Sequence, residues 1–302
     1  MVGVTPARSR RSMPANPYAS PKRILDERGL RPRKRFGQNF LVDAKFAARV
    51  AQAVPQGASI IEIGGGTGVL TAALLERARQ LTVLEIDRDL VPVLRERFDG
   101  EARVNVIEGD ALDFDISASL ATSPPPRAVC GNLPYNITTP LIEKIIACTS
   151  SWESAVLMVQ REYAQRLTAR AGTSEYGSLT VFVGYHCRTT RLIDVGAGAF
   201  YPAPAVASSI VVLEPVGPDA ARARDEHLMS KLVRAAFAQR RKMLVNSVIS
   251  ALAENAPARE LLVRAMKSAG IAEDIRAERV DIDGYVRLAD ALSALGFAAS
   301  HT

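Results

Sequence analysis

The residues best suited to holding a nucleoside follow two neighbouring apolar runs. Gly64-Gly65-Gly66-Thr67-Gly68 comes directly after the apolar run Ser59–Ile63. Glycines let the backbone take a positive φ and let a ligand approach it closely. Glu85 ends the next apolar run, 21 residues after Gly64, where a carboxylate can accept hydrogen bonds from two ribose hydroxyls. This pair of features suits NAD and S-adenosylmethionine equally well.

A third apolar run ends in Glu108-Gly109-Asp110, and Asp110 is a candidate acceptor for an adenine amino group. The alternative is that Gly109-Asp110 forms only a turn and a helix N-cap. Beside Glu85, the carboxylate of Asp110 favours an adenosyl ligand.

The segment Gly131-Asn132-Leu133-Pro134-Tyr135 follows a fourth apolar run and suits methyl transfer to a planar exocyclic amine. Such a nitrogen is a poor nucleophile because its lone pair is delocalised into the ring. The Asn132 side-chain oxygen and the Leu133 carbonyl can accept the two amine hydrogens, while Pro134 fixes the turn. Tyr135 offers an aromatic face on which the base can stack. Attack on a sulfonium methyl depends on positioning more than on a strong base, so no catalytic histidine is expected.

The elements that position these residues alternate between strands and helices. We predict strands over Ser59–Ile63, Leu81–Ile86, Val104–Ile107, Ala128–Gly131 and Ala155–Val159, with helices over Phe46–Val54, Leu70–Ala78, Leu90–Phe98 and Pro140–Ala147. This alternation predicts βαβ units and a parallel sheet covered by helices on both faces. Ligands bind at the carboxyl ends of such strands, which is where the four motifs lie.

The rest of the chain divides into two parts. Leu179–Tyr185 and Ile210–Leu213 are predicted strands that flank a Gly/Ala/Pro-rich loop, Val195–Ala205, and the chain becomes helical from Asp225 onward. We therefore expect a basic N-terminal extension and arm over residues 1–35, a catalytic domain over 36–215 and a smaller all-helical domain over 216–302.

Charge is concentrated in the N-terminal arm. The 302 residues carry a net charge of +6, but residues 1–40 alone carry ten basic and two acidic residues, a net +8, so the remainder is −2. No apolar run is long enough to span a membrane. The three cysteines and three histidines share no ligand spacing, so neither a metal site nor disulfides are expected. Unpaired cysteines are typical of a reducing compartment, so we expect a cytoplasmic protein.

Taken together, these motifs resemble the ribosomal RNA adenine dimethyltransferase family, and in particular its bacterial small-subunit (16S) branch. The resemblance extends from about Leu25 to Asn246. Besides the motifs above it includes Gly37-Gln38-Asn39-Phe40-Leu41, Gln160–Leu167, Tyr176-Gly177-Ser178-Leu179, Phe200–Ser208 and Phe237–Lys242.

The resemblance implies a doubly wound, Rossmann-like class I methyltransferase sheet of seven strands. It implies S-adenosyl-L-methionine as cofactor, bound by Asn39, Leu41, Gly64, Gly66, Gly68, Glu85, Asp110 and Asn132. The reacting adenine would meet Asn132, Leu133, Pro134 and Tyr135, with Phe200 stacking on it opposite Tyr135. The Pro-rich surroundings of Phe200 predict an exposed loop. Gly65 departs from the proline of many members, and we expect it to keep the approach to the turn open.

Two basic clusters are candidate RNA contacts. Arg33, Lys34 and Arg35 precede the Gln38-Asn39-Phe40 segment, which would place cations at the rim of the cofactor cleft. Arg240, Arg241 and Lys242 form the second cluster, on a predicted C-terminal helix.

The expected function is dimethylation at N6 of two adjacent adenosines in the 3′-terminal hairpin of 16S rRNA, within the 30S ribosomal subunit, by a monomeric enzyme that also has a role in small-subunit biogenesis. One alternative is a 23S rRNA adenine dimethyltransferase of the macrolide-resistance type. Another is a 30S assembly factor that needs no catalysis. An NAD-dependent enzyme is disfavoured because no hydride-transfer acid or base follows the glycine turn.

Overall fold

A computed structural model describes residues 20–297, and the extension before Tyr18 lies outside this range. The helices are α1 (Pro21–Glu27), α2 (Ala44–Gln52), α3 (Val69–Leu75), α4 (Val91–Arg97), α5 (Ile116–Ala121), α6 (Thr138–Ile146), α7 (Arg161–Leu167), α8 (Ser178–His186), α9 (Glu226–Phe237), α10 (Leu244–Leu252), α11 (Arg259–Ser268) and α12 (Ile282–Ala294). The strands are β1 (Phe40–Leu41), β2 (Ala58–Ile63), β3 (Ala78–Glu85), β4 (Val104–Glu108), β5 (Arg127–Asn132), β6 (Ser154–Gln160), β7 (Cys187–Val195), β8 (Phe200–Tyr201) and β9 (Ser208–Pro215).

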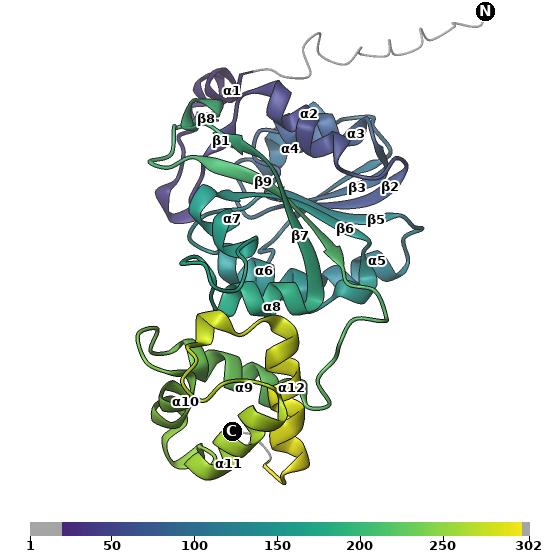
Figure 1. Cartoon of the computed structure of the whole chain (residues 1–302). Coiled ribbons are helices and arrows are strands. Elements are labelled where there is room, and N and C mark those ends of the chain that lie inside the picture. Colours follow the sequence, from purple (N-terminus) through teal and green to yellow (C-terminus); the bar gives the residue numbers. More distant parts are fainter. Residues whose placement is uncertain (1–19, 298–302) are drawn as a thin grey trace, which may run out of the picture.

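Seven strands form the central sheet in the order β4-β3-β2-β5-β6-β9-β7 (Figure 1). The first five are parallel, and β9 runs antiparallel to both β6 and β7. The order reverses between β2 and β5, because β3 and β4 extend the sheet on one side of β2 and the later strands extend it on the other. Ligands bind at such a switch point in doubly wound sheets. The predicted α/β class is therefore confirmed, although the sheet is mixed and not wholly parallel.

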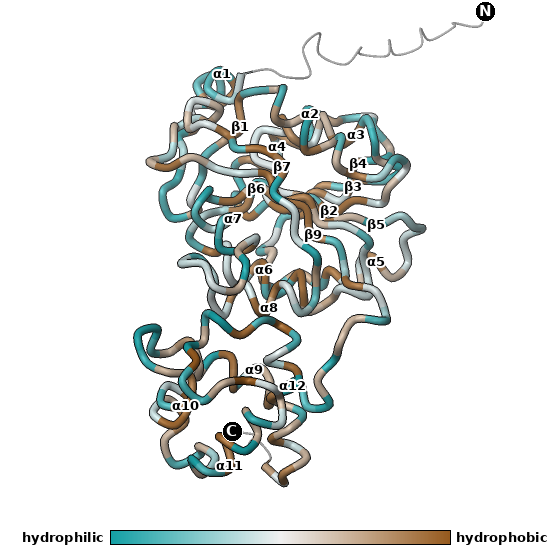
Figure 2. Tube along the Cα trace, viewed as in Figure 1, coloured by the Kyte–Doolittle hydropathy of each residue, from teal (hydrophilic) through white to brown (hydrophobic). Residues whose placement is uncertain are grey.

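Helices cover both faces of the sheet, as the alternating pattern predicts (Figure 1). Apolar side chains of α2, α3 and α4 pack on one face, and those of α5, α6, α7 and α8 pack on the other. The central strands are buried on both sides, so they appear as a brown band in the middle of Figure 2. This rigid layer fixes the strand ends that carry the site.

The N-terminal arm docks against the sheet domain through a small separate core. Leu25 of α1, Phe40 of β1 and Leu90 are buried together, with Leu30 and Tyr201 packed against them. β1 pairs antiparallel with β8, with Phe40 opposite Tyr201 and Leu41 opposite Phe200. The arm is therefore held beside the strand ends by apolar packing and by a two-stranded ladder.

The helices α9 to α12 form the smaller domain, and its core extends into the sheet domain. Tyr176, Val181 and Tyr185 are buried in the same cluster as the apolar faces of these four helices. At Gly184 of α8, a Cβ atom would lie 2.5 Å from Ile282 Cδ1 of α12, so a side chain there would require the Ile282 side chain to move. The chain crosses between the domains after β9 ends at Pro215, but the two domains share α8.

The predicted strand Leu179–Tyr185 is wrong, because this segment lies within α8. Its β-branched and aromatic residues mimic a buried strand, yet they are buried all around a helix: Leu179 and Val183 face the sheet, and Val181 and Tyr185 face the smaller domain. A short apolar run does not by itself distinguish the two structures. The strand β7 that follows was missed because its residues between Cys187 and Val195 are largely exposed at the sheet edge, without apolar alternation.

Candidate active site

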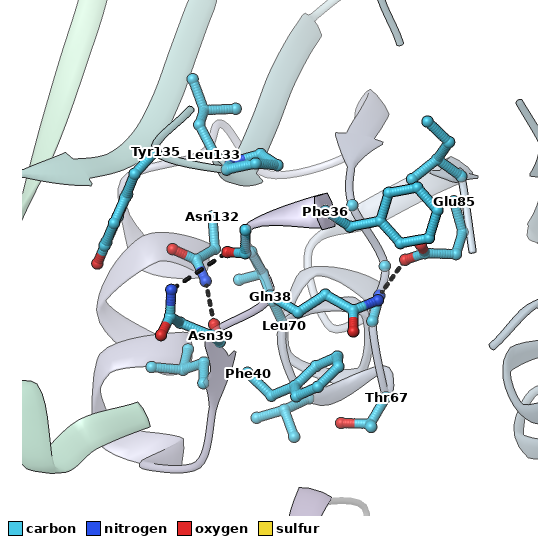
Figure 3. Close-up of a pocket in the computed structure, with 18 residues that line it drawn as sticks. Phe36, Gln38, Asn39, Phe40, Thr67, Leu70, Glu85, Asn132, Leu133 and Tyr135 are labelled. Carbon is cyan, nitrogen blue, oxygen red and sulfur yellow. Dashed lines mark hydrogen bonds between the residues drawn. The ribbon is translucent and has the colours of Figure 1, made fainter. Parts of the chain in front are cut away.

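A pocket lies at the carboxyl ends of β2, β3 and β5 and has about 710 Å³ of space, including its open mouth. One wall is the glycine turn after β2, and the opposite wall is formed by residues 36–41. We call residues 33–41 the strap. Figure 3 shows Asn132 and Tyr135 on one side of the pocket and Glu85 on the other.

The glycine turn adopts backbone conformations that side chains disfavour. Gly64 and Gly66 have φ of 79° and 55°. A Cβ atom on Gly64 would meet only Asn132 O, at 4.0 Å, so a side chain there would occupy the pocket itself. A Cβ atom on Gly66 would lie 3.1 Å from the Phe40 ring of the strap. Gly64 therefore leaves room for the predicted close approach of a ligand to this turn, whereas Gly66 lets the turn pack against the strap.

Glu85 ends β3 with its carboxylate held by two backbone groups. Gly66 N–H donates to Oε2 at 2.7 Å, and Asp87 N–H donates to Oε1 at 2.8 Å. Burial raises the pKa of Glu85, and these two backbone hydrogen bonds oppose the increase. Each oxygen retains a second lone pair, so the carboxylate is oriented and able to accept ribose hydroxyls.

Glu62 lies two residues before Gly64 and is completely buried. Among residues 20–297, neither of its carboxyl oxygens has a hydrogen-bond partner. Burial raises the pKa of Glu62 to about 8; the nearby Thr71 hydroxyl and the charge of Arg97 oppose this increase, and the charge of Glu85 adds to it. Glu62 is therefore largely protonated at pH 7.

Asn132 ends β5 with its amide in a fixed orientation. Its Nδ2 donates to the backbone carbonyl of Asn39 in the strap, at 2.8 Å (Figure 3). Its Oδ1 is buried and has no hydrogen-bond partner within the described part of the chain. A buried acceptor without a partner is costly, so a ligand that donates a hydrogen bond to Oδ1 would be stabilised there.

The three residues after Asn132 complete this side of the pocket. The Leu133 side chain is buried in the core, so only its backbone faces a ligand. The Pro134 carbonyl accepts from Ile137 N–H and from the Thr138 hydroxyl, which fixes the turn into α6. Tyr135 is partly exposed, and its hydroxyl lies 2.6 Å from Ser208 Oγ.

Two predicted cofactor residues do not line the pocket. Gly68, with φ 83°, precedes α3, and a Cβ atom there would lie 2.9 Å from the Phe98 ring, so this glycine serves helix packing. Asp110 follows β4, and its Oδ1 accepts from Leu112 N–H at 2.8 Å. This is the local turn that we considered as the alternative for Gly109-Asp110. Leu41 and Asn39, by contrast, line the pocket as predicted.

The predicted exposure of Phe200 is wrong. Its side chain is only 4% exposed and packs in the core on the α2–α3 face of the sheet. The cause is β8, which pairs Phe200 with Leu41 of the strap. The proline-rich sequence that suggested an exposed loop begins only after this short strand.

Arg33 is held within the protein and is not a free cation at the cleft rim. Its guanidinium pairs with Asp87 Oδ1 at 2.6 Å and also with Asp89. Gln38 joins this network, because its Nε2 donates to Asp87 Oδ2 at 2.8 Å and its Oε1 accepts from Arg33 N–H at 2.7 Å. Neither Gln38 nor Asp87 was predicted to have a role. The only signal was a pair of acidic residues, Asp87 and Asp89, shortly after Glu85 and opposite in charge to the arm.

The other predicted RNA contacts fall into two groups. Lys34 and Arg35 are exposed beside the pocket-lining part of the strap. Residues 240–242 lie in the turn between α9 and α10 and not on a helix, and Arg241 and Lys242 are exposed there. Arg240 instead donates to the carbonyls of Ser174 and Tyr176, at 3.2 Å for Tyr176, and so joins the turn to the sheet domain.

Ile86 also lines the pocket and is 40% exposed, which is unusual for a large apolar side chain. It was missed because an apolar residue at a strand end looks like part of the strand. Within residues 20–297, no cluster of His, Cys, Asp or Glu could hold a metal ion. In the same range, no helix has the length and apolar character needed to cross a membrane.

Comparison with known proteins gives one consistent family. A sequence model described as "Ribosomal RNA adenine dimethylase" matches residues 29–294. Ribosomal RNA small subunit methyltransferase A of Pseudomonas fluorescens (strain Pf0-1) is 42% identical over 264 residues, which cover 86% of this chain and 93% of that protein. The Pseudomonas aeruginosa (PAO1) protein of the same name is 42% identical over 267 residues, 88% of this chain and 96% of that protein.

Comparison with solved structures gives the same family. A dimethyladenosine transferase from Plasmodium falciparum superposes with a TM-score of 0.74 at 26% identity, covering 86% of this chain and all of that one. The 23S rRNA methyltransferase ErmE superposes with a TM-score of 0.64 at 27% identity, covering 84% of this chain and all of that one. The first of these two structures is the more similar in overall fold.

Proposed function

Since the chain belongs to the ribosomal RNA adenine dimethylase family, we propose that it dimethylates N6 of two adjacent adenosines in the 3′-terminal hairpin of 16S rRNA. The substrate would be the RNA within the 30S subunit, and the methyl donor would be S-adenosyl-L-methionine. The relatives at 42% identity are named for the small subunit, which favours 16S over 23S rRNA as the target.

The observation that carries this proposal is the fixed amide of Asn132. The hydrogen bond from Nδ2 to the Asn39 carbonyl fixes the orientation of this amide, and its unpartnered Oδ1 is an acceptor, as recognition of an amine requires. With the Leu133 carbonyl, Oδ1 would bind the amine hydrogens of the extruded adenine and turn the nitrogen lone pair out of the ring. Tyr135 would stack on the base. Residues that only orient an amine perform this reaction without a strong base.

The pocket also fits S-adenosyl-L-methionine. The buried Glu85 carboxylate would hold the ribose hydroxyls, Gly64 and Gly66 would let the ligand lie against the turn, and Ile86 would pack on an apolar part of it. When bound, this cofactor supplies a methyl group on a positively charged sulfur. Among the residues proposed from the sequence, Asn39, Leu41 and Asn132 line the pocket and remain proposed cofactor contacts, whereas Gly68 packs against Phe98 and Asp110 lies outside the lining.

The test is methyl transfer from labelled S-adenosyl-L-methionine to 30S particles that lack the modification. We expect label in dimethyladenosine of 16S rRNA with the wild-type chain and none with Asn132→Ala. Label in 23S rRNA alone would identify the macrolide-resistance type of activity. If Asn132→Ala still binds particles and supports their maturation, the assembly role is separable from catalysis.

We further propose that Lys34, Arg35, Arg241 and Lys242 contact RNA phosphates, because all four are exposed. Each alanine substitution should weaken 30S binding and reduce the slope of log K against log salt by roughly 0.7–0.9. Arg33→Ala is the matched control, since Arg33 pairs with Asp87 and Asp89. It should leave the salt slope unchanged and raise the concentration of cofactor required. An equal change in slope for Arg33→Ala would contradict this division of roles.

A further inference from the structure

Tyr135 makes a single side-chain hydrogen bond within the described structure, to Ser208. The two oxygens, Tyr135 Oη and Ser208 Oγ, are 2.6 Å apart. Tyr135 lies in the turn between β5 and α6, and Ser208 is the first residue of β9. Two segments separated by more than seventy residues therefore meet at the aromatic ring beside Asn132.

Ser208 is the fixed partner of this pair. It is completely buried, and it is paired with Gln160 of β6 on one side and with Val195 of β7 on the other. The preceding residue is fixed as well, since the Ala207 carbonyl accepts from Arg161 N–H at 2.9 Å at the start of α7. The backbone of Ser208 is thus anchored on both sides within the sheet, which leaves its buried hydroxyl only rotation about a single side-chain bond.

Tyr135, by contrast, lies at the pocket and is only partly buried. A phenolic ring at an open pocket can rotate about two side-chain bonds unless its hydroxyl is held. The hydrogen bond to Ser208 supplies this restraint from outside the pocket, because Ser208 does not line it.

We propose that Ser208 is a positioning residue that holds the ring of Tyr135 in the orientation in which it meets the substrate base. This inference rests on the proposed function, in which Tyr135 stacks on adenine. Ser208 acts only through Tyr135, so it contributes to catalysis without touching substrate or cofactor. Functional side chains need this kind of support, since a loosely held group loses much of its effect.

The test compares Ser208→Ala with Ser209→Ala in methylation of unmodified 30S particles by the full chain. Ser209 is a matched control because it is the next residue, is also completely buried, and donates its own hydrogen bond, to Asp194 Oδ1 at 2.7 Å. We expect Ser208→Ala to lower kcat roughly 3- to 10-fold, the effect of one lost hydrogen bond. Its cofactor Kd and unfolding midpoint should match those of Ser209→Ala, whose kcat stays at the wild-type value. Ser208→Thr keeps the hydroxyl and should recover most of the lost rate.

Tyr135→Phe breaks the same hydrogen bond from the other side and leaves β9 untouched. It should lower kcat as much as Ser208→Ala does, and the double variant should be no slower than either single one. Wild-type kcat in Tyr135→Phe, additive losses in the double variant, or equal losses in Ser208→Ala and Ser209→Ala would each overturn the proposal. A wild-type chain that leaves 16S rRNA unlabelled would instead contradict the proposed function.

Discussion

Glu62 shows how the chemistry of one side chain is set by its surroundings. It lies in β2 beneath the glycine turn, and its carboxyl group is buried without a hydrogen-bond partner among the described residues. The folded chain keeps the carboxyl protonated up to a pKa of about 8, whereas the unfolded chain releases the proton near the ordinary value of 4.5. Between these values the folded state binds more protons than the unfolded state does. Its free energy of unfolding therefore falls as the pH rises.

Glu62→Gln should remove this pH dependence. Glutamine is similar in shape and does not ionise, so the variant should gain stability over the wild type as the pH rises from 5.5 to 7.5, by at most about 1.4 kcal/mol per pH unit. Urea unfolding at several pH values measures the difference. Glu254→Gln alters an exposed carboxyl and should follow the wild type. Parallel pH profiles for Glu62→Gln and wild type would show that Glu62 ionises equally in both states.

The sequence predicts the contacts of some site residues in the fold and not those of others. Glu85, Asn132 and Tyr135 line the pocket as predicted, because strand ends in a doubly wound sheet have fixed positions. Arg33 and Phe200 were misjudged, because their partners are distant in sequence. Arg33 forms an ion pair with Asp87, and Phe200 lies in β8, which pairs with β1. Spacing along the chain carries no information about such contacts.

At the scale of elements, the strand ends were predicted well and the helix α8 was not. Strands β2, β5 and β6 are almost entirely buried and lie between clear turn signals, so their positions follow from the sequence. The segment Ser178–His186 has the same apolar character but is enclosed by two domains. Only the presence of the second domain makes it a helix with every face buried.

The glycine turn gives a prediction at this scale. We expected Gly65 to keep the approach to the turn open, but a Cβ atom there would lie 2.4 Å from Val83 Cγ1 and 2.8 Å from Leu94 Cδ1. Gly65 therefore allows the turn to pack closely on β3 and α4. Gly65→Ala should lower the free energy of unfolding by about 1–3 kcal/mol, because both neighbours are fully buried.

Chemical denaturation of Gly65→Ala tests this packing role. Gly217→Ala is the control, since a Cβ atom there has no neighbour within 4 Å. Equal stability of Gly65→Ala and Gly217→Ala would mean that the turn has room for a side chain.

At the scale of the whole molecule, the shared core makes the two domains dependent on each other. The boundary near residue 216 is a proposal from composition, and β9 ends beside it. Yet Tyr176, Val181 and Tyr185 are buried only where the C-terminal helices cover them. A fragment of residues 1–215 should therefore expose a large apolar surface.

We expect this fragment to unfold roughly 10 °C or more below the full chain and to bind a hydrophobic dye, given the burial free energy of three large side chains. Calorimetry and dye fluorescence measure both effects. Adding residues 216–302 as a separate polypeptide should raise the midpoint again. A fragment that unfolds at the full-chain temperature without binding dye would show that the sheet domain is self-sufficient.

Charge is also a property of the whole chain that sequence describes only in part. The net +8 of residues 1–40 correctly marks the arm as the basic region, yet part of it is neutralised within the fold by Asp87, Asp89 and Glu96. The positive charge left for a partner is therefore smaller than the sequence total suggests.

The strap has a consequence that concerns the arm as a whole. It is joined to the sheet domain by side-chain hydrogen bonds from Asn132, Asn136 and Gln38, and it supplies one wall of the pocket. A ligand that touches both walls adds its binding free energy to the docking of the arm. The rate of trypsin cleavage after Lys34 and Arg35 thus reports how much of the protein has ligand bound in the pocket. The more tightly the pocket is filled, the more slowly these exposed sites are cut.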